Sequence, residues 1–77
     1  MRWQETNNQI SKEFKFADFA AALDFVNKVG ALAQEANHHP DIELGWGRVK
    51  ITLTTHSENK VTDKDTILAK QIDQIRL

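Results

Sequence analysis

The chain has 77 residues, with 10 basic and 11 acidic side chains and no cysteine. A domain this small buries only about 60% of its unfolded surface, and without disulfides it needs other support, so we expect a homodimer or homotetramer. Charges of both signs are interspersed, no apolar run could span a bilayer, and the first residues do not resemble a signal peptide. We therefore expect one domain over residues 1–77, in the cytoplasm, with neither nucleic acid nor membrane as partner.

Alternating apolar and polar side chains predict two strand hairpins. Residues 9–16 alternate with a period of two, and the turn-forming pair Asn7-Asn8 before them lets residues 3–6 form the first arm. The second hairpin is predicted from a short strand at residues 42–44 and a longer one at residues 48–55, joined by a Gly-Trp-Gly turn.

Two amphipathic helices are predicted, one after each hairpin. The first begins at an N-cap, Asp18, and ends near Ala36, with Asn37 as a left-handed terminating residue. The second begins at Thr62, where Asp65 stands at the capping-box position. The apolar residues expected to face the core are Phe19, Leu23, Val26, Val29, Ala33 and Ala36, then Ile67, Leu68, Ile72 and Ile75. The order β-β-α-β-β-α predicts an α+β two-layer sandwich, a four-stranded antiparallel sheet with both helices on one face.

All three histidines of the chain lie between residues 38 and 56. His38 and His39 follow the predicted first helix, and His56 ends the long strand. If the second hairpin forms, Pro40 and His56 come to the same end of the sheet, and the three imidazoles converge. Because the unperturbed pKa of histidine is about 6.5, such a group can donate and accept protons within one turnover.

Other interpretations of these residues stay open. Histidines at strand ends are often only solvated, Trp46 suits a core or an interface, and Asp65 suits a helix cap. Three histidines and a carboxylate would also suit zinc. However, neighbouring residues in an extended chain point to opposite sides, so His38 and His39 do not readily share one ion, and we expect no metal.

The spacing of these residues resembles the signature of the pterin-4a-carbinolamine dehydratases. That signature is His-His-Pro, then an aromatic residue, then His, then Asp. Here five residues separate Pro40 from Trp46, nine separate Trp46 from His56, and eight separate His56 from Asp65. The flanking strands and helices match as well, so the resemblance covers the chain from Trp3 to Ile75.

The resemblance implies dehydration of a 4a-hydroxytetrahydropterin to the quinonoid dihydropterin, by acid/base catalysis without cofactor or metal. It implies that His38, His39 and His56 form the catalytic set, and that Asp65 orients a histidine or closes the site. It also implies that Trp46 shapes the pocket wall. The implied substrate-binding residues are His38, His39, Pro40, Thr55, His56, Ser57, Glu58 and Asp65.

Two departures from the family pattern support an alternative function. Gln34 stands four residues before His38, where the family usually has an ionisable side chain. We also expect the chain to lack the N-terminal segment that longer members carry before the first strand. The alternative is a non-catalytic, dehydratase-like module for binding, dimerisation or assembly.

Overall fold

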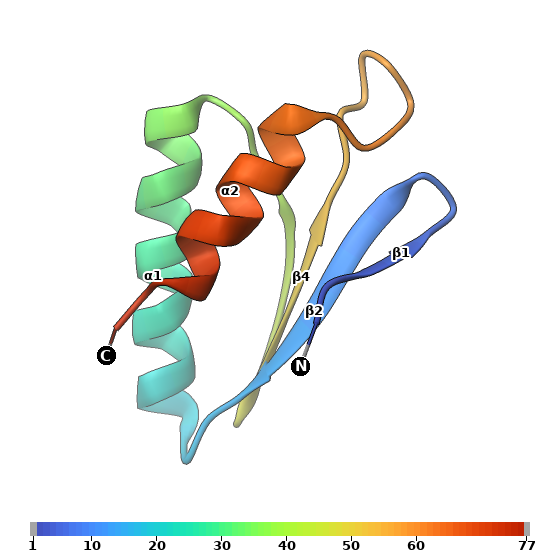
Figure 1. Cartoon of the computed structure of the whole chain (residues 1–77). Coiled ribbons are helices and arrows are strands. Elements are labelled where there is room, and N and C mark those ends of the chain that lie inside the picture. Colours follow the sequence, from blue (N-terminus) through green and yellow to red (C-terminus); the bar gives the residue numbers. More distant parts are fainter. Residues whose placement is uncertain (1, 77) are drawn as a thin grey trace.

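The computed structural model of the chain describes residues 2–76, which form one sheet with both helices on the same face (Figure 1). The elements are β1 (Gln4–Thr6), β2 (Gln9–Lys15), α1 (Phe19–Ala36), β3 (Asp41–Gly45), β4 (Arg48–Leu53) and α2 (Asp63–Asp73). The strand order is β1-β2-β4-β3, and every neighbouring pair is antiparallel. The predicted α+β sandwich with the order β-β-α-β-β-α is confirmed.

Short turns set the register of both hairpins. Asn7 and Asn8 have φ values of 54° and 65°, which the two-residue turn between β1 and β2 requires and which asparagine tolerates better than most residues. Trp46 and Gly47 connect β3 to β4. A Cβ on Gly47 would lie 2.8 Å from the carbonyl oxygen of Phe16, so the chain needs glycine there.

The core lies between the helices and one face of the sheet. Its buried apolar residues are Ile10, Ala22, Phe25, Val29, Ala33, Val49, Ile51, Leu53, Leu68, Ala69 and Ile72. The alternation in β4 therefore identified the buried face correctly. Neither helix formed by residues 2–76 has the length and apolar character that crossing a bilayer requires.

The predicted apolar faces of the helices are partly wrong. Phe19 and Leu23 of α1 are 44% and 40% exposed, and Ile67 of α2 is 58% exposed. The faces that pack are rotated toward small residues, Ala22 in α1 and Ala69 in α2, both buried. Small side chains let a helix approach the sheet closely. The prediction placed the large apolar side chains on the buried face instead.

This rotation can be tested with two truncations in α1. Replacing the buried Phe25 by alanine should lower the free energy of unfolding by about 3–5 kcal/mol, because it leaves a cavity beside Phe14 and Phe16. The comparison change Leu23→Ala should cost about 1 kcal/mol or less, since that side chain is 40% exposed. Urea denaturation followed by circular dichroism measures both, and equal losses would contradict the observed orientation of α1.

Candidate functional site

The C-terminal end of α1 fixes the backbone of the first histidine. Asn37 has the left-handed values φ 52° and ψ 42°, and its N–H donates to the carbonyl of Gln34 at 3.2 Å. The N–H of His38 donates to the carbonyl of Ala33 at 3.1 Å. These two bonds form a Schellman motif, which satisfies the last carbonyls of a helix and reverses the chain. His38 and His39 therefore leave α1 in a defined direction.

The N-terminal end of α2 holds the acidic partner. Asp65 is the third residue of α2, and its Oδ2 accepts the backbone N–H of Thr62 at 2.9 Å. This contact is the half of a capping box that the third helical residue supplies, so the prediction that Asp65 caps its own helix is confirmed. The Asp65 side chain is fully buried. Aspartate is almost never fully buried unless it is paired, so partners for its carboxylate are expected.

Three donors meet the Asp65 carboxylate. Its Oδ1 lies 2.5 Å from Nε2 of His38, and its Oδ2 also accepts the hydroxyl of Thr55 at 2.8 Å. The hydroxyls of Thr55 and Thr62 are 2.7 Å apart, and since Thr55 gives its one proton to Asp65, Thr62 must donate to Thr55. The network joins the ends of α1 and β4 to the start of α2.

These contacts set the charge of Asp65 and the tautomer of His38. Burial alone would raise the pKa of the Asp65 carboxyl, but hydrogen bonds from His38, Thr62 and Thr55 outweigh burial and leave the pKa below its usual value of 3.8. Asp65 is therefore an anion at neutral pH and can only accept. Nε2 of His38 must carry a proton, so Nδ1 is the ring nitrogen at which His38 can gain or lose one.

The other two histidines lie at the same end of the molecule. His39 is exposed, and its Nε2 lies 2.5 Å from the side-chain oxygen of Gln34. His56 is exposed in the turn that follows β4, directly after the buried Thr55. Figure 1 shows the end of α1, this turn and the start of α2 together at one end of the sheet. Gln34, noted in the sequence only as a departure, thus contacts His39 because Asn37 turns the chain back over α1.

Three residues occupy positions that differ from those expected. Thr55 and Asp65 are both buried and engaged within the protein, so the direct substrate contact predicted for them is not available in this structure. Trp46 is 70% exposed in the β3–β4 turn, at the opposite end of β4 from His56. Because the six residues of β4 span roughly 17–20 Å, Trp46 lies far from the histidines of its own chain and does not line their site within one chain.

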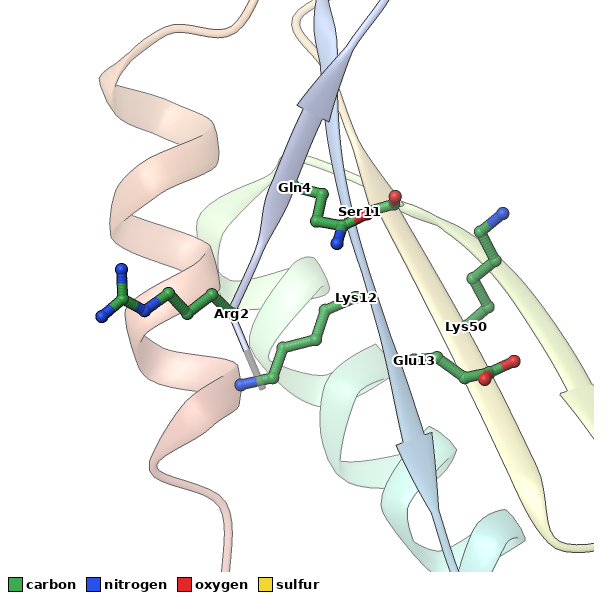
Figure 2. A pocket seen from close by; sticks show the side chains of 6 residues that line it. All are labelled: Arg2, Gln4, Ser11, Lys12, Glu13 and Lys50. Carbon is green, nitrogen blue, oxygen red and sulfur yellow. The ribbon is translucent and has the colours of Figure 1, made fainter.

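Surface hollows lie beside the histidine end and on the sheet. One of about 420 Å³ is lined by Glu58, Lys60, Val61, Thr62, Asp63 and Lys64, without a histidine. Another, of about 290 Å³, is lined by Arg2, Gln4, Ser11, Lys12, Glu13 and Lys50 (Figure 2). Two of its charges are paired, Lys12 with Asp73 and Glu13 with Arg48. The hydrogen bond from Arg48, with one from Lys15, keeps the pKa of Glu13 below its usual value.

A metal centre has little support in the geometry. Within residues 2–76, no three side chains of histidine, aspartate or glutamate are grouped closely enough to hold an ion. The Nε2 of His38 is bound to a carboxylate, and the Nε2 of His39 faces an amide oxygen. The arrangement instead suits proton transfer at ring nitrogens.

Comparison with known proteins gives a consistent result over nearly the whole chain. The family model described as pterin 4 alpha carbinolamine dehydratase matches residues 1–75. Relatives carrying the pterin-4-alpha-carbinolamine dehydratase name include one from Rubrobacter xylanophilus, 47% identical over 88% of this chain, and one from Picosynechococcus, 45% identical over 95%. The chain spans 64% and 79% of their respective lengths.

Two solved structures resemble this fold. A protein from Brucella melitensis described as a transcriptional coactivator/pterin dehydratase has a TM-score of 0.88 and 37% identity, covering 92% of this chain and 78% of its own. A pterin dehydratase-like protein described as a RuBisCO assembly factor in the alpha-carboxysome has a TM-score of 0.76 and 27% identity, covering 94% and 83%.

The buried carboxylate makes stability depend on pH in a defined direction. Because the pKa of Asp65 is lowered in the folded state, its contribution is complete above the unfolded value of 3.8 and is lost as pH falls through the folded value. Asp65→Asn should cost about 3 kcal/mol at pH 7 and progressively less below pH 3.8.

The matched control is Asp63→Asn, at an exposed position in the first turn of the same helix. Urea denaturation at pH 7, 5 and 3 measures both variants. A cost for Asp65→Asn that equals that of Asp63→Asn at pH 7, or that grows on acidification, would contradict the network.

Proposed function

The chain belongs to the pterin-4a-carbinolamine dehydratase family, and from that premise we propose that it dehydrates 4a-hydroxytetrahydropterin to quinonoid dihydropterin and water. The reaction would serve the recycling of tetrahydrobiopterin or a related pterin. The observation that carries the proposal is the contact between His38 and the buried Asp65. Asp65 binds Nε2 of His38, so that Nδ1 is the nitrogen left for proton transfer.

The chemistry needs two proton transfers and no redox change. One group protonates the hydroxyl on C4a, so that the C4a–O bond breaks and water leaves. The lone pair of the adjacent ring nitrogen forms the new C=N bond, and a second group removes the proton from that nitrogen. The net change is the loss of one molecule of water. Histidines can act as both the proton donor and the proton acceptor, so no covalent nucleophile is needed.

We assign these transfers to His38, His39 and His56. His38 acts through Nδ1, since its Nε2 is committed to Asp65. His39 and His56 are exposed at the same end of the chain, where a pterin ring can reach them. The surface that we propose for substrate binding comprises His38, His39, Pro40, His56, Ser57 and Glu58, with Thr55 and Asp65 supporting it from the interior.

The first test is the decay of the 4a-carbinolamine, followed by stopped-flow absorbance with and without the protein. The wild-type protein should accelerate the decay, and each single change, His38→Ala, His39→Ala or His56→Ala, should slow turnover. A positioned acid or base contributes about 10²–10⁴-fold, so loss of a key histidine should raise the barrier by about 3–5 kcal/mol. Near-normal turnover in all three folded variants would overturn the assignment.

The proposed chemistry is also independent of metal. Dehydration should survive exhaustive treatment with EDTA, because the adjacent His38 and His39 are poorly arranged to chelate one ion and their Nε2 atoms have other partners. The same stopped-flow decay measures the outcome. Loss of activity on chelation, restored by added zinc, would replace the acid/base account with a metal mechanism.

One observation favours a second candidate function. The structural neighbour at a TM-score of 0.76 is described as an assembly factor, so this fold also serves a protein whose described role is assembly. A non-catalytic dimerisation or assembly module would keep the fold after loss of the histidines' reactivity. The two functions separate in the stopped-flow assay, since an assembly module leaves the spontaneous decay of the carbinolamine unchanged.

A further inference from the structure

We propose that Gln34 is a positioning residue for His39, whose ring it holds so that Nδ1 is the nitrogen that exchanges protons. The side-chain oxygen of Gln34 lies 2.5 Å from Nε2 of His39. A carbonyl oxygen can only accept, so Nε2 must donate and therefore carries a proton. The assignment deepens the proposed dehydratase function and rests on it for its consequence in turnover.

The backbone around His39 is already restrained, which makes one side-chain bond effective. The Schellman motif at Asn37 fixes the direction in which the chain leaves α1. Pro40 follows His39 and disfavours the helical region for the residue before it, which favours an extended backbone at His39. The bond to Gln34 then restricts the rotation of the imidazole.

His38 and His39 are both bound at Nε2, so each would exchange protons at Nδ1, although their partners differ. Each ring is held at Nε2, His38 by the buried carboxylate of Asp65 and His39 by the neutral amide of Gln34. An amide oxygen orients the ring without placing a negative charge beside it. Two neighbouring histidines that are each held at Nε2, one by an anion and one by a neutral group, are suited to different proton-transfer roles.

Two substitutions of Gln34 distinguish the effect of its hydrogen-bond acceptor from the effect of a side chain of that size. Gln34→Met keeps the length and the helical propensity but removes the acceptor, whereas Gln34→Glu keeps an oxygen that can accept the Nε2 proton. Both changes lie on the exposed surface of α1, so neither should affect folding. The matched control is Gln71→Met, at an exposed glutamine of α2.

The test measures two quantities on the same samples, the ¹⁵N chemical shifts that report which ring nitrogen of His39 carries the proton, and the rate of turnover. In ¹⁵N-histidine-labelled wild-type protein, neutral His39 should have a protonated Nε2 and a bare Nδ1, and Gln34→Glu should keep that pattern. Gln34→Met should shift the His39 nitrogens toward the averaged tautomers of the exposed His56 ring, and should lower kcat about tenfold, less than loss of the base itself. Gln71→Met should change neither.

Two results would overturn the proposal. One is a wild-type His39 that carries its proton on Nδ1, and the other is an unchanged His39 spectrum in Gln34→Met. Both are observed without substrate, so they are independent of whether the protein is a dehydratase. A wild-type protein that does not accelerate carbinolamine decay would reject the proposed function, while the ring-nitrogen spectra would still decide what Gln34 does.

Discussion

The buried carboxylate of Asp65 is the constraint on which the rest of this end of the molecule depends. One anion without access to water must be satisfied by protein donors, and three segments supply them, His38 after α1, Thr55 after β4 and Thr62 before α2. The same bonds therefore start a helix, fasten two helices to a strand and fix a histidine ring. Folding and the proposed chemistry are coupled because they share one carboxylate, and a change that weakens the cap also releases His38.

The sequence predicted most of the fold because its signals were local. Alternation, the Asn7-Asn8 turn and the left-handed Asn37 each act within a few residues, and all were confirmed. The exposure of Leu23 was not predicted, because it depends on how α1 packs against the sheet. The predicted hairpin already placed Trp46 in its turn, away from His56, so only the role taken from the family resemblance is not supported within one chain. Residue type and spacing singled out His38 and Asp65, which the structure brings into contact. The contact between Gln34 and His39 needs the reversal of the chain after α1, which no spacing rule contains.

The fold by itself does not decide between catalysis and assembly, since similar structures carry both descriptions. What distinguishes a catalyst is the state of its reactive groups. In this chain, two histidines have one ring nitrogen bound and lie beside a partner of defined chemistry, at the end of the molecule that also carries exposed His56. Asp65 also caps α2 and binds Thr55, so its hydrogen bonds serve the fold as well as His38, and they offset the cost of burying the anion.

The central claim is that His38 and Asp65 act as one unit in turnover, and a double-mutant cycle tests it most directly. The measurement is kcat/KM for carbinolamine dehydration in the wild-type protein, His38→Gln, Asp65→Asn and the double variant, at a temperature where all four are folded by circular dichroism. Groups that act together are strongly non-additive, so the double variant should lose no more than the worse single variant. Losses that multiply, with each change acting independently of the other, would contradict the account.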